Sequence, residues 1–214
     1  MRRTRVGIIF DDGFAKSTLA TADIFDSYKL PTVFGVLADP SNFVPGCGDW
    51  AMWNELQRRG HIIQPHGQTH AKLSDLPPAQ AIDLVRQCLD DFSQHLDGFD
   101  PKNALYACTY NTPTRETVEW LLPRVRAVRV GGEPLLSDAD LNSRVWRSFT
   151  EGPHDGYEDY VRYLDLAARK RPAALFLCLH GLDGEYWGAV SSDHLRRLLD
   201  RITTDEAFEY WPLT

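Results

Sequence analysis

Three clusters of acidic and imidazole side chains could together bind a metal ion and catalyse hydrolysis. Asp11 and Asp12 are adjacent, His66 and His70 are spaced i, i+4, and His180 lies far along the chain. One carboxylate and two imidazoles form a ligand set for a divalent ion that leaves positions open for water and substrate. Such an ion polarises a carbonyl and lowers the pKa of its bound water to about 7. A second carboxylate can then accept the water's proton, and another histidine can protonate the leaving nitrogen.

Each cluster taken alone also has a structural explanation. Asp-Gly is a common turn, a carboxylate after a strand can cap a helix, and histidine pairs occur on ordinary surfaces. What the three clusters share is that each follows an expected strand, namely those that carry the apolar residues 6–10, 62–63 and 175–179. Since one shared position is harder to explain three times by chance, we expect the clusters to form one site.

The elements that would position these clusters alternate along the chain. Short apolar runs predict strands, and the longer amphipathic stretches between them predict helices. The expected strands are 6–10, 32–37, 62–63, 104–107, 127–130 and 173–179, and the expected helices are 17–28, 50–59, 77–96, 114–122, 157–171 and 192–202. This order predicts an α/β fold with a parallel sheet covered by helices. Because the strands are spread evenly, we expect residues 1–214 to form a single barrel domain, with an open doubly wound sheet as the alternative; both place function at the carboxyl ends of the strands.

Composition limits the possible partners. The chain has 214 residues, 43% hydrophobic and 25% charged, with a formal net charge of −7. This acidic balance argues against a nucleic-acid or anionic-membrane partner, since both require a basic surface. No stretch approaches the roughly 20 apolar residues of a transmembrane helix. Four dispersed cysteines without a CxxC pair and the lack of a recognisable signal peptide favour a cytoplasmic protein with reduced thiols.

Several motifs resemble those of the NodB-type polysaccharide deacetylases, carbohydrate esterase family 4. The sequence FDDGF at 10–14 resembles the first family motif, and HGQTH at 66–70 resembles the His-x-x-x-His motif. The segment 53–61 resembles the approach to that second motif, and LCLHG at 177–181 resembles the late leucine-histidine motif. The resemblance extends over nearly the whole chain, with the motifs in the family's order.

The resemblance implies a fold and a reaction. The fold would be a distorted (β/α)7-type barrel with a single NodB-like domain. Asp12, His66 and His70 would hold one divalent ion, most often zinc, with Asp11 as general base and His180 as general acid. The substrate would be a small molecule or oligosaccharide bearing an N-acetyl group on an amino sugar or sugar conjugate, and the enzyme would release acetate from it.

The third and second motifs depart from the family pattern. The third motif commonly reads Arg-x-Pro-Tyr, where this chain has Ala107-Cys108-Thr109-Tyr110. Tyr110 keeps the position whose backbone N–H would face the developing oxyanion. The arginine that orients the catalytic aspartate is missing, and Arg129 could supply its charge from a neighbouring strand or be an ordinary surface arginine. In the second motif Gly67 replaces the usual Ser or Thr.

The fourth motif, an aspartate beside a tryptophan that holds the acid histidine, is not recognisable. Possible substitutes for this aspartate near Trp146 are Asp138, Asp140, Glu151 and Asp155. Aromatic residues after the strands could stack on a substrate or belong to the core. The candidates for substrate contact are Trp50, Tyr186 and Trp187.

Three functions fit these observations. The first is a metal-dependent deacetylase acting on a small or soluble N-acetylated sugar. The second keeps the site but hydrolyses a linear or cyclic amide outside sugar chemistry, as the altered third and fourth motifs allow. The third is a metal-binding module with a decayed catalytic site; the presence of both Asp11 and His180 argues against it.

Overall fold

Seven parallel strands form a barrel in the computed structural model, which describes residues 2–150, 152 and 156–214. The strand order is β3-β2-β1-β8-β7-β5-β4. These strands are β1 (Thr4–Phe10), β2 (Val33–Val36), β3 (Ile62–Pro65), β4 (Leu105–Ala107), β5 (Ala127–Gly131), β7 (Val145–Thr150) and β8 (Ala174–Leu179). The predicted barrel is therefore confirmed, and the alternative of an open doubly wound sheet is wrong.

The barrel is distorted where its first and last strands meet. β3 and β4 are the two ends of the hydrogen-bonded order. Between them, the backbone N–H of Leu105 donates to the side-chain oxygen of Gln64 at 2.8 Å. A buried amide side chain thus bridges the gap that strand pairing leaves.

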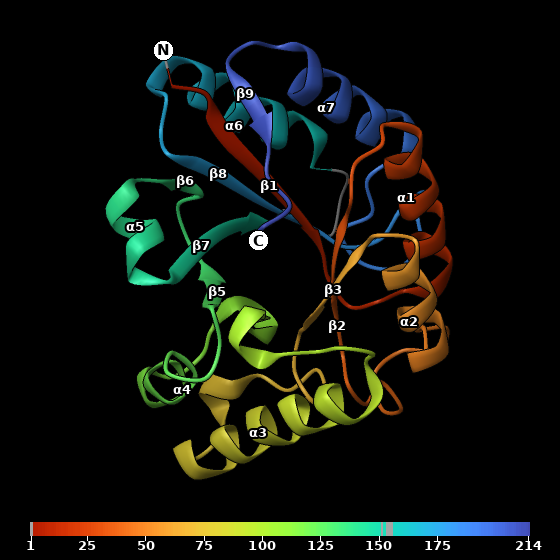
Figure 1. Cartoon of the computed structure of the whole chain (residues 1–214), viewed down its shortest axis with the longest axis vertical. Helices are drawn as coiled ribbons and strands as arrows, with labels where there is room; N and C mark the ends of the chain where they lie inside the picture. The colour runs from red at the N-terminus through yellow and green to blue at the C-terminus, as the bar shows by residue number, and fades with distance from the viewer. Residues whose placement is uncertain (1, 151, 153–155) are drawn as a thin grey trace.

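Helices surround the barrel (Figure 1). They are α1 (Ala15–Ser27), α2 (Trp50–Arg58), α3 (Pro78–His95), α4 (Arg115–Leu121), α5 (Asp138–Ser143), α6 (Tyr157–Lys170) and α7 (Ser192–Thr204). Side-chain oxygens of Asp49, Thr114 and Ser191 accept backbone N–H groups at the starts of α2, α4 and α7. These caps satisfy orphan donors of the first turn and explain why the predicted boundaries lie close to the observed ones.

Three of the described strands and one α-helix were not predicted: β6 (Leu135–Leu136), β7, β9 (Phe208–Tyr210) and α5. β7 alternates buried Trp146 and Ser148 with half-buried neighbours, and it includes Arg147, so it lacks the continuous apolar run of the other strands. β6, α5 and β9 are short, and short elements carry little periodic signal.

Apolar side chains fill the amino-terminal part of the barrel interior. Trp211 and Leu213, from the chain's last segment, pack with Phe176 and Trp146 in this cluster. The last segment can approach β1 closely because residue 7 is glycine: a Cβ at this position would lie only 2.3 Å from Leu213 Cδ2. Because these side chains fill the amino-terminal end of the barrel, a functional site is expected at the carboxyl ends of the strands.

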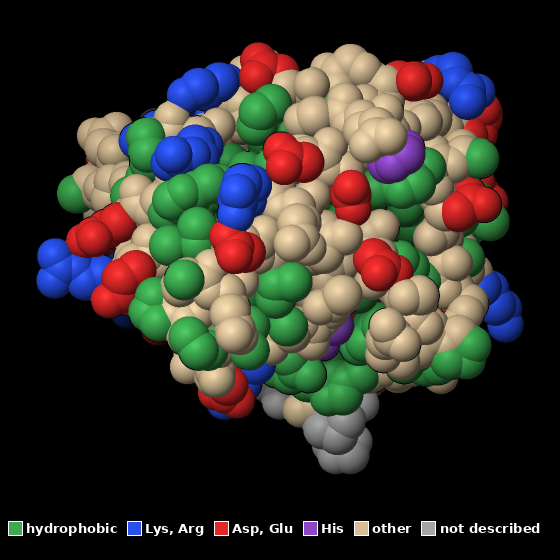
Figure 2. Space-filling model, turned by 90° about the horizontal axis from the view of Figure 1, so that it is seen from below, with side chains coloured by type: hydrophobic (Ala, Val, Ile, Leu, Met, Phe, Trp, Pro, Cys, Tyr) green, Lys and Arg blue, Asp and Glu red, His purple; other side chains and the backbone are tan. Residues whose placement is uncertain are grey.

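The outer surface carries charges of both signs. Figure 2 shows acidic and basic side chains interspersed with apolar and polar ones over one face of the molecule. In the described part of the chain, none of the helices combines the length and the apolar character needed to cross a bilayer.

Candidate active site

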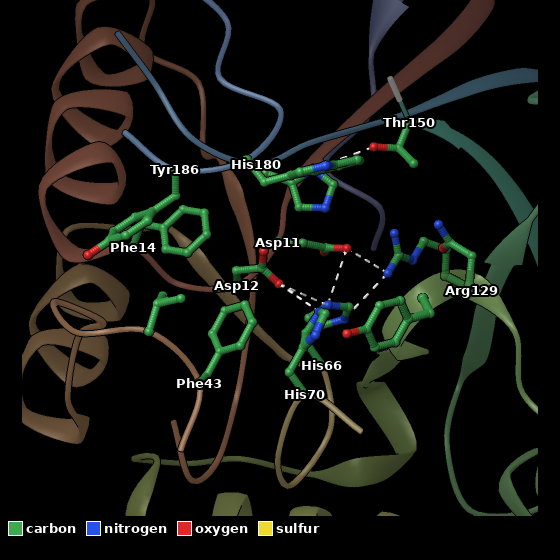
Figure 3. A pocket seen from close by; sticks show the side chains of 14 residues that line it. Asp11, Asp12, Phe14, Phe43, His66, His70, Arg129, Thr150, His180 and Tyr186 are labelled. Atoms are coloured by element: carbon green, nitrogen blue, oxygen red, sulfur yellow. Dashed lines mark hydrogen bonds and ion pairs between the residues drawn. The ribbon is translucent and has the colours of Figure 1, made fainter. Parts of the chain in front are cut away.

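A cavity of about 430 Å³ opens at the carboxyl ends of the barrel strands (Figure 3). Asp11 and Asp12 follow β1, His66 follows β3, and His180 follows β8. The cavity is lined by Asp11, Asp12, Phe14, Phe43, Val44, His66, His70, Tyr110, Asn111, Arg129, Thr150, His180, Tyr186 and Trp187. The structure therefore brings all five central residues predicted from the sequence into one cavity.

Asp12, His66 and His70 converge on one point. Asp12 Oδ1 lies 3.4 Å from His66 Nε2 and 3.3 Å from His70 Nε2. One ligand atom from each of the three residues lies within 4.8 Å of the others. A carboxylate with two imidazoles at this spacing matches the donor set of a catalytic zinc site.

The unpaired atoms of this cluster also fit a metal ion. Asp12 Oδ1 is buried and has no hydrogen-bond partner among the described residues. His66 approaches the backbone carbonyl of Ala107 with its Nδ1 at 2.8 Å, so Nδ1 carries the proton and Nε2 is left with a free lone pair. Burial raises the pKa of Asp12, but the neighbouring imidazoles of His66 and His70, together with His180, outweigh this effect and lower the carboxyl pKa, so Asp12 is ionised. The three residues therefore suit a divalent cation.

The backbone around these ligands requires unusual conformations. Asp12 has φ of 75° and the following Gly13 has φ of 73°, in the left-handed region that Asp tolerates better than most residues. Gly67, the departure in the second motif, has φ of 112°. A Cβ there would lie 3.1 Å from Thr109 Cγ2, so glycine fits this turn and larger residues would be strained.

Asp11 forms a buried ion pair with Arg129. Arg129 Nη2 lies 2.6 Å from Asp11 Oδ2, and both side chains are almost completely buried. Burial raises the pKa of Asp11, but the positive charge of Arg129, followed by His66 and His180, outweighs this effect and lowers it. Because its side chain is completely buried, Arg129 is not an ordinary surface arginine, which was one of the two explanations considered for it.

Cys178 is a third member of this buried group and was not predicted from the sequence. Its Sγ lies 3.2 Å from Asp11 Oδ2, to which the thiol donates, and it accepts a hydrogen bond from Arg129 Nη1 at 2.9 Å. Burial raises the pKa of Cys178 well above its usual value, so the sulfur stays a neutral thiol. The sequence did carry a signal for this residue. Cys178 lies in β8 two residues before His180, and alternate residues of a strand share a face, so the two side chains could have been expected on the same side of the sheet.

His180 lies beside Asp11 and Cys178, with one ligand atom of each residue within 4.8 Å of the others. Thr150 Oγ1, at the end of β7, is 3.4 Å from His180 Nδ1, and the Trp187 ring packs edge-to-face on the imidazole at 4.5 Å. Burial lowers the pKa of His180, while the charges of Asp12 and Asp11 act in the opposite direction. The His180 imidazole is therefore held by the Thr150 hydroxyl and the Trp187 indole, and the carboxylates of Asp11 and Asp12 lie near it.

A family model for polysaccharide deacetylases matches residues 1–121. The chain belongs to the polysaccharide deacetylase family. The matched half contains the Asp11-Asp12 pair and both histidines of the second motif. No significant match was found among curated proteins.

Solved structures of carbohydrate esterase family 4 share this fold. A family 4 carbohydrate esterase from Streptomyces lividans, in complex with acetate, is 14% identical with a TM-score of 0.60, covering 94% of this chain and 88% of that one. The Bc1960 peptidoglycan N-acetylglucosamine deacetylase is 14% identical with a TM-score of 0.64, covering 99% and 87%. BA3943 from Bacillus anthracis, a family 4 pseudoenzyme, is 9% identical with a TM-score of 0.65, covering 98% and 63%. At these identities the likeness concerns the fold alone.

This deacetylase-family chain differs from the sequence-based expectation at the rim of its site. Trp50 does not line the cavity, because its indole packs against Phe92 at 5.0 Å and stacks on His95 at 5.4 Å. That expectation is wrong, since the start of α2 faces α3 and not the strand ends. Tyr186 and Trp187 do line the cavity.

The candidates for the missing fourth-motif aspartate separate into two groups. Asp138 pairs with Arg2, and Asp140 accepts the backbone N–H of Ser137 in the capping box of α5 and pairs with Arg147, so both are engaged at the surface. Glu151 and Asp155 lie outside the described residues. The residue that the structure places beside His180 Nδ1 is Thr150.

The third-motif tyrosine has an exposed ring. Tyr110 is 53% exposed, and its ring lies 4.5 Å from that of His70. Its backbone is in the left-handed region, with φ of 52° and ψ of 7°. The cavity also includes Phe14, the last residue of the first motif, and Phe43, Asn111 and Thr150, which the sequence did not single out as site residues.

Proposed function

We propose that this protein is a metal-dependent deacetylase that hydrolyses an N-acetyl group on an amino sugar or sugar conjugate and releases acetate. The observation that carries the proposal is the presence of a three-residue ligand set, Asp12, His66 and His70, in the same cavity as Asp11 and His180. Family membership supports the class of bond, because it indicates a hydrolase acting on an N-acetyl amide. Zinc is the proposed ion, since the donor set is one carboxylate and two imidazoles.

In this proposal each residue has a distinct task. A bound divalent ion would supply Lewis acidity toward the acetyl carbonyl and the attacking water. Asp11, kept ionised by Arg129, accepts the proton of that water at its carboxylate. The backbone N–H of Tyr110 donates to the developing oxyanion.

His180 delivers a proton to the leaving nitrogen. A histidine whose pKa is lowered by burial releases its proton readily, and the charges of Asp12 and Asp11 favour its reprotonation. Thr150 and Trp187 hold the ring so that it faces the cavity. In this proposal the base follows β1, the acid follows β8, and the bond to be cleaved lies between them.

A second candidate function is hydrolysis of an amide outside sugar chemistry. The observation that favours it is the apolar character of one side of the cavity, where Phe14, Phe43 and Val44 lie. Product analysis separates the two, because this reaction on a substrate without an acetyl group releases no acetate.

The test measures metal content and acetate release with the same variants. Asp11→Asn should retain one zinc per chain and lose turnover of N-acetylated sugars, whereas His70→Ala should lose both. His95→Ala, at an exposed histidine on α3, is the matched control and should retain both. Acetate release that survives Asp11→Asn would remove this residue from the base role, and a zinc-loaded enzyme inert toward every N-acetylated sugar would refute the proposal.

A further inference from the structure

Two loops meet across the start of α1 and form one side of the cavity. The first follows β2 and carries Phe43 and Pro45; the second follows β8 and carries Tyr186. Tyr186 donates its hydroxyl hydrogen to the carbonyl oxygen of Pro45, and its ring lies 4.8 Å from that of Phe14. The two loops are therefore joined to each other next to Phe14, the residue before the start of α1.

The second loop is also fixed to α1 by a capping interaction. Helix α1 begins after Phe14, which provides no side-chain cap. Glu185 supplies one from the other end of the chain: its carboxylate accepts the backbone N–H of Ser17 at 2.5 Å and the Ser17 hydroxyl. The Leu182 backbone N–H donates to Ser17 Oγ at 2.9 Å. These bonds hold the loop and leave Tyr186 little freedom to swing out of the cavity.

The side of the cavity formed by these loops is aromatic and offers few hydrogen bonds. We define the aromatic wall as Phe14, Phe43 and Tyr186. In Figure 3 these residues lie on the opposite side of the acidic pair from Arg129 and Thr150. The Tyr186 hydroxyl is already bonded to Pro45, so the wall presents ring faces and edges. A sugar hydroxyl pressed against it would lose its water without a replacement partner, at a cost of about 1–3 kcal/mol.

The wall reaches the proposed metal ligands. The Phe43 ring stacks on His70 at 4.4 Å and 28°, so a substrate bound at the metal must also contact the wall. Polar groups of Tyr110, Asn111 and Thr150 also line the cavity, and Thr150 lies opposite the wall in Figure 3. Asn111 lines the cavity, and its side-chain oxygen has no hydrogen-bond partner among the described residues.

We propose that the aromatic wall closes the cleft on the side of β2, β1 and β8, so that the site accepts one terminal or free N-acetylated sugar ring and excludes the interior of a polymer. The apolar face of the ring packs on the wall, and its hydroxyls point toward Asn111 and Thr150. The cavity volume of about 430 Å³ agrees with this, because it is near the low end of the roughly 300–1,000 Å³ of small-molecule sites. This inference rests on the proposed deacetylase function.

The experiment measures binding apart from turnover. Zinc-loaded Asp11→Asn protein is titrated by calorimetry with N-acetylglucosamine and with chitopentaose. With the wall intact, we expect the pentamer to bind no more than about twofold tighter than the single sugar. Adding Tyr186→Ala should open the cleft, tighten pentamer binding about tenfold and weaken binding of the single sugar.

Two further variants control for the loss of an exposed aromatic ring. Tyr186→Phe keeps the ring and should keep the preference. Leu19→Ala removes an apolar side chain that is 43% exposed, the same fraction as Tyr186, from the outer part of α1 and should change neither affinity. Mass spectrometry of chitopentaose treated with the wild-type enzyme should find deacetylation only at a chain end.

Pentamer binding ten times tighter than the single sugar in the presence of Tyr186, or deacetylation at internal sugars, would overturn the inference. Absence of binding by both sugars would overturn it as well. Binding with the expected preference but no acetate release by the zinc-loaded wild-type enzyme would support the wall and contradict the proposed function. The two failures are therefore distinguishable.

Discussion

Replacing Arg129 with methionine tests how the charge state of Asp11 is maintained. Arg129 Nη2 lies 2.6 Å from Asp11 Oδ2, with relative side-chain exposures of 0% and 2%. Methionine keeps an unbranched apolar stem but removes the charge and its hydrogen bonds to Cys178 and to the Cys108 carbonyl. Asp11 would then remain as a buried carboxylate without its principal counter-charge.

The expected cost follows from this burial. Breaking one partner of a buried ion pair destabilises a protein by about 3–5 kcal/mol, because the other charge stays desolvated. For a chain of this size, each kcal/mol lowers Tm by about 2–4 °C, so Arg129→Met should melt roughly 6–20 °C below the wild type. An exposed pair such as Arg115–Glu119 provides the contrast, since Arg115→Met should change stability by less than about 1 kcal/mol.

The direction in which pH changes the stability of each protein follows from the pKa of Asp11. In the wild type the pKa of Asp11 is lowered from 3.8, so its contribution to stability is present above that value and is lost as pH falls through the folded-state pKa. In Arg129→Met, burial dominates and raises the pKa of Asp11 above its unfolded value. The ionised carboxylate then costs stability at neutral pH, and this cost disappears on acidification. The stability gap between the two proteins should therefore narrow as pH falls from 7 toward 4.

The assay is urea unfolding of four proteins: the wild type, Arg129→Met, Asp11→Asn and the double variant. A chelator is present so that no metal charge contributes to the measured stability. Coupled residues should give a double-mutant interaction energy of about 1–3 kcal/mol. Additive losses, or a stability gap that widens toward low pH, would refute the electrostatic explanation of Arg129.

Two other substitutions probe the surroundings of the site. Gly35→Ala should lower turnover at least about tenfold with the metal retained, because a Cβ there would lie 2.6 Å from Asp11 Oδ1. Gly98→Ala controls for backbone strain alone: Gly98 has φ of 68° and a Cβ there meets nothing within 4 Å, so the variant should lose some stability but keep its turnover in the same kinetic assay. Glu185→Gln should lower stability by about 1 kcal/mol in a thermal melt by weakening the cap of α1, and an unchanged Tm would show that the carboxylate does not cap this helix.

Sequence patterns located the centre of the site because its residues follow strands directly. Asp11, His66 and His180 each come immediately after the last residue of a buried strand, so a parallel sheet brings them to one end. Helix boundaries were also predictable, since residues such as Asp49 and Thr114 act through local caps. Both signals depend on neighbours in the sequence.

The rim could not be predicted in the same way. Tyr186 and Pro45 meet only because two loops with irregular backbones turn toward each other, and no periodicity describes such loops. Trp146, which the sequence offered as a marker for the missing fourth motif, is buried in β7, and its ring centroid lies 5.0 Å from that of Trp211. Its strand was overlooked because Arg147 and Ser148 interrupt the apolar pattern.

The register of β4 and β5 explains how a buried charge reaches Asp11 although the third motif lacks arginine. Ala107, which stands where the resembling motif has that arginine, is the direct partner of Arg129 across these parallel strands. Registered partners on neighbouring parallel strands point to the same face, so the small Ala107 leaves space into which Arg129 extends. We infer that the site requires one guanidinium at this level of the barrel, from either strand.

This requirement predicts the outcome of an exchange between the two positions. Ala107→Arg in an Arg129→Ala background should restore part of the stability and turnover lost in Arg129→Ala. Ala107→Arg alone should destabilise the protein, because two guanidinium groups would then share one buried carboxylate. Melting temperature and turnover measured on all three variants decide the matter. If the exchanged variant were no better than Arg129→Ala, the position of the arginine, and not only its charge, would be essential to Asp11.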